Sequence, residues 1–181
     1  MGDKIKSIDE LSAVAADARA AGRKVVLAHG VFDILHVGHK RHLELGKRNG
    51  ELLFVTITTD RHVNKGPGRP VFPEQLRAEM LAGLEIVDAV GISPNPSAEY
   101  VIEKIRPDIY LKGSEYSAEA KDVTGRITTE RLTVEKYGGR LLFTDDITFS
   151  SSNLANLACK SIRKRPMNFS MRCAGASPST I

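Results

Sequence analysis

The stretch that decides the fold of this chain is Val25-Val26-Leu27-Ala28-His29-Gly30-Val31-Phe32-Asp33-Ile34-Leu35-His36-Val37-Gly38-His39. Its apolar start, 25–28, predicts a buried parallel strand, and residues 38–49 predict a helix that Gly50 ends. Backbone N–H groups at a helix start are unpaired and point beyond the carboxyl end of the strand, where open α/β sheets hold ligands. The stretch therefore predicts a ligand site at a strand–helix junction.

The rest of the chain alternates predicted strands and helices. The strands are expected at 24–28, 52–58, 88–92, 109–111 and 140–144, and the helices at 7–22, 38–49, 74–83, 97–105, 127–137 and 150–163. A capping box, Ser7 to Glu10, begins the first helix, and the cluster Ser150 to Asn153 begins the last. Because strand–helix–strand units of this length make parallel crossovers, we expect one domain with an open doubly wound, Rossmann-like α/β sheet of five parallel strands.

The composition is that of a soluble globular protein, with 41% hydrophobic and 27% charged residues among 181. No apolar run reaches the roughly 18 to 20 residues that a bilayer span needs. We therefore expect a cytoplasmic protein without membrane contact. We also expect a domain over residues 1–163, whose first helix, 7–22, is an N-terminal extension, and a disordered or loosely attached tail over 164–181.

The net charge of +4 comes from the end of the chain, because residues 159–181 hold five basic and no acidic residues. A domain that is otherwise nearly neutral has no field that attracts nucleic acid, so no nucleic-acid partner is expected. The two cysteines, Cys159 and Cys173, lie in the same segment without CxxC spacing or paired histidines. This pattern argues against a disulfide scaffold and against a zinc site.

Two histidines at the junction carry the chemistry. His36 and His39 are three residues apart across a turn into a helix, so both imidazoles can face one space, and Gly38 lets a ligand approach the helix start. Such donors suit a polyphosphate, since they stabilise charge on phosphoryl oxygens. Two other interpretations stay open: a metal site made by His36, His39 and His42, or plain polar surface. Asp33, at the strand's carboxyl end, is positioned to hold a metal or to orient an imidazole.

Two loops stand out by composition. Residues 62–70 hold too many Gly and Pro for a regular element, so we expect a mobile surface loop. Residues 114–126 form a second, longer polar loop, and loops of that length in a compact domain are usually functional or disordered.

Gly30 to His39 resembles the HxGH signature of the nucleotidyltransferase superfamily, which comprises cytidylyltransferases and related adenylyltransferases. The segments 65–77, 84–88, 107–116 and 150–153 follow in the order found in the adenylyltransferase domain of bacterial ADP-heptose synthase. That similarity covers about residues 24–160, most of the chain.

The resemblance implies nucleotidyl transfer without a covalent enzyme intermediate. A sugar phosphate attacks the α-phosphorus of a nucleoside triphosphate, AMP being the group expected to be transferred, and pyrophosphate leaves. It also implies Mg²⁺ bound with the nucleotide and a homodimer. A CTP-dependent cytidylyltransferase acting on an alcohol or sugar phosphate is the runner-up, and a nucleotide-binding module without turnover is the third hypothesis. Asp145-Asp146 stands where glycerol-phosphate cytidylyltransferases carry an arginine, which disfavours CTP and glycerol phosphate.

The resemblance also assigns roles to individual residues. The catalytic residues are His36, His39 and the loop cation Lys65. The nucleotide-binding residues are Gly30, Val31, Phe32, Asp33, Gly38, Arg69, Arg77, Ser150, Ser151 and Ser152. The acceptor would lie near Lys112, Gly113 and Tyr116, and Asp33 is the candidate metal ligand. Each assignment has a plainer alternative: a solvated basic loop for Lys65 and Arg69, a surface ion pair for Arg77, and simple helix capping for the serines.

Overall fold

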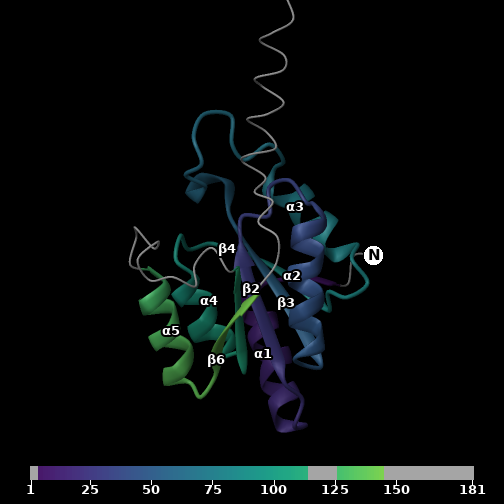
Figure 1. Ribbon diagram of the computed structural model, residues 1–181, viewed down its shortest axis with the longest axis vertical. Coiled ribbons are helices and arrows are strands. Elements are labelled where there is room, and N and C mark those ends of the chain that lie inside the picture. The colour runs from purple at the N-terminus through teal and green to yellow at the C-terminus, as the bar shows by residue number, and fades with distance from the viewer. Residues whose placement is uncertain (1–3, 114–125, 145–181) are drawn as a thin grey trace, which may run out of the picture.

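The computed structural model describes residues 4–113 and 126–144, and it forms one α/β domain around a parallel sheet (Figure 1). The strand order is β1-β4-β3-β2-β5-β6. The strands are β1 Ile5–Lys6, β2 Val25–Gly30, β3 Leu52–Thr58, β4 Ala89–Ser93, β5 Ile109–Gly113 and β6 Arg140–Thr144. All pairs are parallel, which confirms the predicted doubly wound, Rossmann-like fold class.

The sheet has six strands where the sequence predicted five. The additional strand is β1, whose two residues pair with β4 through Ile5↔Val90 and Lys6↔Gly91. Two residues are too few to show an alternating pattern, so nothing in the local sequence marks this strand. It forms because α1, which follows at once, is packed over the edge of β4.

Helices cover both faces of the sheet. They are α1 Ile8–Ala20, α2 Val37–Arg48, α3 Glu74–Ala82, α4 Ala98–Ile105 and α5 Arg126–Lys136. Figure 1 shows α2 and α3 on one side of the sheet, with α4 and α5 on the other. Each side has its own core: one contains Leu11, Val101 and Ile105, and the other contains Leu43, Leu81 and Val90. No helix in the described part of the chain is long and apolar enough to cross a bilayer.

The start of α1 follows the predicted capping box. Ser7 Oγ accepts from the backbone N–H of Glu10 at 3.2 Å, and the Glu10 carboxylate accepts from the backbone N–H of Ser7 at 2.7 Å. The buried face of α1 approaches β4 where a glycine stands, since a Cβ at Gly91 would lie 2.6 Å from Leu11 Cδ1. Local capping and close packing together hold α1 against the sheet.

The order of the strands reverses direction at β2. The chain runs from β2 outward to β3 and β4 on one side, and then crosses over to build β5 and β6 on the other side. The β2–β5 register stops at Ala28↔Leu111, whereas β2 continues to Gly30 against β3 and β5 continues to Gly113 against β6. The strands thus separate at their carboxyl ends, at the switch point where open α/β sheets bind ligands.

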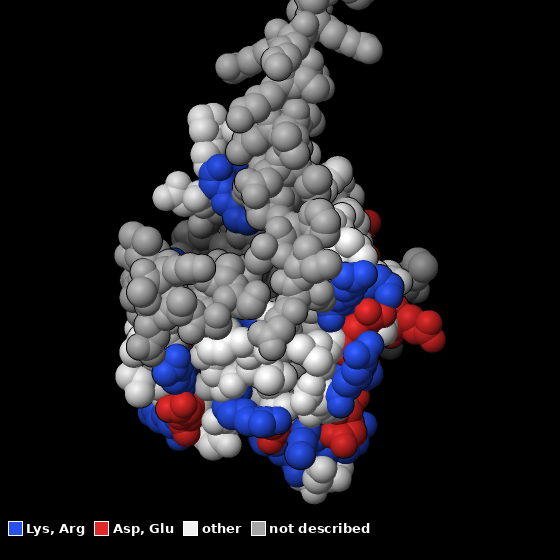
Figure 2. Space-filling view, viewed as in Figure 1, with Lys and Arg blue, Asp and Glu red and all other residues white. Residues whose placement is uncertain are grey.

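The surface of the described residues is mixed in charge. On the face shown in Figure 2, basic and acidic side chains are interspersed along the lower part of the molecule. The predicted loop 114–126, except for Arg126, the last helix, 150–163, and the tail, 164–181, lie outside the described residues.

Candidate active site

The predicted junction forms a tight turn between β2 and α2. β2 ends at Gly30, and Phe32 then adopts φ +48°. The helix begins at Val37, one residue earlier than predicted, because His36 is its N-cap: Nδ1 accepts from the backbone N–H of Gly38 at 3.1 Å. A ring nitrogen that accepts carries no proton, so in the neutral ring Nε2 carries the hydrogen and is a donor.

The two signature histidines stack against each other. Their ring centroids are 3.9 Å apart with 32° between the planes, and the Phe32 ring lies 5.3 Å from the His39 ring. Burial lowers the pKa of His36. Burial also lowers the pKa of His39 to about 4, helped by the nearby His36, His42 and Lys65. Both rings are therefore neutral near pH 7 in the unliganded protein.

Buried nitrogens without partners gather at this turn. Among the described residues, His36 Nε2, His39 Nδ1 and one terminal nitrogen of Arg69 are buried and have no hydrogen-bond partner. Leaving such groups unsatisfied costs free energy, so several of them at one turn indicate a place where a ligand supplies the missing partners.

Asp33 fastens the loop that carries Arg69 to the junction. Its carboxylate is fully buried and accepts from the backbone N–H groups of Val71 at 2.6 Å and Phe72 at 3.2 Å. The other carboxylate oxygen pairs with Arg69 Nε at 2.5 Å. Asp33 is therefore occupied by protein donors, which does not suit the role of metal ligand.

The alternative interpretation, a metal site made by three histidines, does not assemble either. In residues 4–113 and 126–144, no group of three or more His, Cys, Asp or Glu side chains is placed to hold a metal ion. His42 instead makes a hydrogen bond to Thr144 Oγ1, with Nδ1 3.0 Å away. This contact joins α2 to the end of β6, across the switch point.

Arg77 lies behind the junction. Its side chain is fully buried and donates to the carbonyl oxygens of Val31, of Phe72 at 3.0 Å and of Thr58 at 2.8 Å. It also donates to Asp60 Oδ1 at 2.6 Å. One guanidinium thus joins the turn after β2, the turn after β3 and the loop before α3. The sequence singled out Arg77 for phosphate but did not reveal Asp60 as its partner.

The Gly/Pro-rich loop places Lys65 close to the histidines. Its positive charge contributes to the low pKa of His39, so the two groups lie within electrostatic reach. Gly66 and Gly68 lie between Lys65 and Arg69 in the sequence. Their φ angles are +93° and +73°, a region that glycine adopts without strain. The loop thus supplies two cations, Lys65 within electrostatic reach of His39 and Arg69 paired with Asp33.

Across the switch point, Lys112 ends in an ion pair. Its Nζ lies 2.7 Å from Glu130 Oε2 of α5, and both side chains are largely buried. His29, at the end of β2, forms a hydrogen bond with Thr56 Oγ1 at 2.9 Å, and burial lowers the pKa of His29 to about 3. No signal in the sequence marked Glu130, because α5 looked like an ordinary helix.

The structure therefore brings most predicted site residues to one edge of the sheet. The turn from Gly30 to Gly38, with Val31 and Phe32 within it, adjoins Arg69 and lies within electrostatic reach of Lys65, and Arg77 supports it from inside. Lys112 and Gly113 end β5, the strand that separates from β2 at its carboxyl end. Tyr116 and the serines Ser150, Ser151 and Ser152 lie outside the described residues.

Comparison with known proteins agrees with this geometry. The sequence model of the family described as cytidylyltransferase-like matches residues 27–157. The bifunctional protein HldE of Methylobacillus flagellatus is 37% identical over 153 residues, which are 83% of this chain and 30% of that protein. HldE of Pseudomonas fluorescens is 41% identical over 117 residues, 64% of this chain and 24% of the relative. The chain thus spans less than a third of the length of these relatives.

Solved structures show the same fold. A lipopolysaccharide core biosynthesis protein from Thermoplasma volcanium superposes with a TM-score of 0.58 at 25% identity, covering 70% of this chain and 100% of that one. Pantoate-beta-alanine ligase from Francisella tularensis, solved with beta-gamma ATP and beta-alanine, gives a TM-score of 0.60 at 14% identity. It covers 88% of this chain and 75% of the ligase, and at that identity it supports the fold alone. The family match over most of the chain confirms the resemblance seen in the signature: the chain belongs to the cytidylyltransferase-like family of nucleotidyltransferases.

Proposed function

We propose that the chain transfers AMP from ATP to the phosphate of a sugar phosphate and releases pyrophosphate. The observation that carries the proposal is the group of buried, unpartnered nitrogens of His36, His39 and Arg69 at the start of α2. A triphosphate offers oxygen acceptors for the donors of this group, and the positive end of the helix adds to its binding.

The reaction is a direct displacement at phosphorus. An oxygen of the acceptor phosphate forms a bond to the α-phosphorus, the bond from that phosphorus to the bridging oxygen of the β-phosphate breaks, and pyrophosphate leaves with the electron pair. A phosphate monoester is already largely ionised at neutral pH, so the attack requires no general base. This agrees with histidines that are neutral near pH 7.

The protein's part is to stabilise charge. His36 Nε2 donates to an oxygen whose charge grows as the bonds change, and Lys65 and Arg69 balance the departing pyrophosphate. Binding of the anionic triphosphate raises the pKa of His39 from its unliganded value of about 4, which strengthens its hydrogen bond.

The nucleotide brings its Mg²⁺ as part of the substrate, because Asp33 is occupied by Arg69 and by backbone donors. The choice of ATP and a sugar phosphate is supported by the resemblance of residues 24–160 to the adenylyltransferase domain of ADP-heptose synthase. The solved relative named for lipopolysaccharide core biosynthesis points to the same class of acceptor. CTP is the second candidate, and the family's own description favours it.

The test is pyrophosphate release by the full chain with each of ATP, CTP, GTP and UTP, combined with hexose and heptose phosphates. We expect ATP with a sugar phosphate to give the highest kcat/KM. A cooperatively folded protein that releases no pyrophosphate with any pair would refute the enzyme hypothesis. Tight nucleotide binding without turnover would instead identify a nucleotide-binding module.

A further inference from the structure

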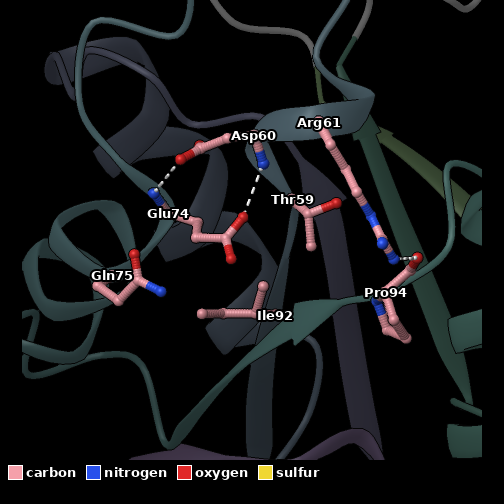
Figure 3. Close-up of a pocket in the computed structure, with 7 residues that line it drawn as sticks. All are labelled: Thr59, Asp60, Arg61, Glu74, Gln75, Ile92 and Pro94. Carbon is pink, nitrogen blue, oxygen red and sulfur yellow. Dashed lines mark hydrogen bonds between the residues drawn. The ribbon is translucent and has the colours of Figure 1, made fainter.

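A cavity lies beside the junction, at the same edge of the sheet. Its volume is about 490 Å³, and it opens between η2 Asp60–His62, the start of α3 and the end of β4. Figure 3 shows its polar side chains on one side and an apolar residue below them. The lining residues that matter here are Asp60, Arg61, Glu74, Gln75, Ile92 and Pro94. Of these six, only Asp60 takes part in the contacts of the histidine junction, through Arg77.

The cavity adjoins the histidine junction through Arg77. Asp60 of the cavity accepts from one terminal nitrogen of Arg77 at 2.6 Å, and the other terminal nitrogen donates to the carbonyl oxygen of Val31 in the junction. A single guanidinium group therefore separates the cavity wall from the turn that leads to the histidines. The cavity and the junction are therefore neighbours at the carboxyl edge of the sheet.

Two carboxylates are held rigidly in the cavity wall. Glu74 Oε2 accepts from the backbone N–H of Asp60 at 2.7 Å, and Asp60 Oδ2 accepts from the backbone N–H of Glu74 at 3.1 Å. Figure 3 shows both contacts as dashed lines. This reciprocal arrangement fixes the carboxylates, and each retains lone pairs for further donors, because an ionised carboxylate accepts about four hydrogen bonds.

The remaining lining groups complete a surface of mixed polarity. Arg61 donates to the carbonyl oxygen of Pro94 at 2.9 Å, and Gln75 is exposed with an amide that both donates and accepts. Ile92 and Pro94 supply the apolar part. Phosphate is disfavoured by two carboxylates, and a cation is disfavoured by Arg61, so the chemistry favours an uncharged ligand rich in hydroxyl groups.

We propose that this cavity binds the hydroxyl-rich carbon chain or ring of the acceptor, while the acceptor's phosphate lies beside the α-phosphate of the nucleotide at the histidine junction. The assignment rests on the proposed function. Hydroxyl groups donate to Asp60 and Glu74, Gln75 contacts the rim of the sugar, and the C–H surface of the sugar packs on Ile92 and Pro94. A volume in the usual range for small-molecule sites suits a hexose or heptose, and glycerol would leave most of it empty.

The test uses the full chain and two variants, Glu74→Gln and Gln75→Ala. In Glu74→Gln the new amide oxygen would still accept from the backbone of Asp60, so the wall keeps its shape while a charge-assisted hydrogen bond is lost. We expect KM for the sugar phosphate to rise about tenfold in Glu74→Gln and about threefold in Gln75→Ala. KM for the nucleotide and kcat at saturating acceptor should change by less than about twofold. Glu79→Gln, an exposed position on the same helix, is the matched control and should behave as wild type.

Calorimetric titration with the sugar phosphate separates this proposal from the proposed function. If wild type binds the sugar phosphate without turnover and Glu74→Gln weakens that binding, the subsite stands and the activity fails. If wild type turns over sugar phosphates but neither variant alters acceptor KM, the activity stands and the subsite is refuted. Absence of both binding and turnover also refutes the subsite. Preference for ethanolamine phosphate, lost in Glu74→Gln, would show an amine site instead and overturn the proposal.

Discussion

The ion pair between Asp33 and Arg69 is expected to hold the Lys65 loop in place, and Asp33→Asn tests this. The asparagine side chain would keep one oxygen for the backbone N–H of Val71 but would leave the Arg69 guanidinium, 10% exposed, without its counter-charge. Removing one partner of a buried pair costs about 3 to 5 kcal/mol. Because Arg69 retains slight access to water, we expect the free energy of unfolding to fall by about 3 kcal/mol, the lower end of that range.

The assay is urea unfolding of wild type, Asp33→Asn, Arg69→Met and the double variant. In the double variant no buried charge remains unpaired, so it should recover at least about 1 kcal/mol relative to the sum of the single losses. Activity should not recover with it, because the Arg69 nitrogen assigned to the triphosphate is gone. We expect kcat/KM for the nucleotide to fall about 100-fold in both variants that contain Asp33→Asn, since the loop is misplaced.

Three results would refute this account of the ion pair. A loss below about 1 kcal/mol in Asp33→Asn would mean that the pair does not hold the loop. Strict additivity of the two single variants would mean that the two side chains do not interact in solution. Recovery of full activity in the double variant would remove Arg69 from the nucleotide site.

Other contacts give three further predictions. His39→Ala should lower kcat by about 100- to 1,000-fold with an unchanged urea midpoint, and a normal rate would remove the junction from the mechanism. The folded pKa of His29 is about 3 against its ordinary value of 6.5, so the unfolded chain takes up the proton first and stability is lost as pH falls below about 6.5. Urea unfolding at pH 6.5 and 4.5 should show a loss to which His29 and His39 each contribute about 2 kcal/mol. His29→Gln should therefore reduce this loss by about 2 kcal/mol, whereas an equal loss in both proteins would contradict the burial of His29. Arg77→Lys cannot bridge Val31, Thr58 and Asp60 at once, so it should destabilise by about 2 kcal/mol and raise the acceptor's KM; wild-type values in both measurements would argue against its bracing role.

Much of the fold was predictable because its signals are local. The apolar runs at Val25 to Ala28 and Leu52 to Thr58 became adjacent central strands, and the capping box at Ser7 began the first helix as expected. The two-residue strand β1 was missed, since its only mark is its pairing with β4. The start of α2 at Val37 was predicted one residue too late, because the imidazole of His36, rather than a hydroxyl or carboxylate, caps it.

The candidate site was predictable as a set of residue types but not as a set of contacts. The signature indicated His36 and His39, and their stacked, partly buried rings agree with a shared role. The pairing of Lys112 with Glu130 was not visible, because an acidic residue on a helix resembles any solvated position until its helix is docked.

The sequence by itself determined the alternation of the longer strands with helices, the junction at Gly30 to His39 and the family. Hydrophobic periodicity, helix caps and the contiguous signature depend only on residues that are close together in the sequence. They can therefore be interpreted without the tertiary structure. Only the tertiary structure decided that Asp33 pairs with Arg69, that Arg77 joins three loop segments from inside, and that a cavity forms beside Asp60. These are contacts between residues far apart in the chain, such as Arg77 and Val31 at a separation of 46. Their partners are chosen by how the packed sheet brings its carboxyl ends together, which no local pattern encodes.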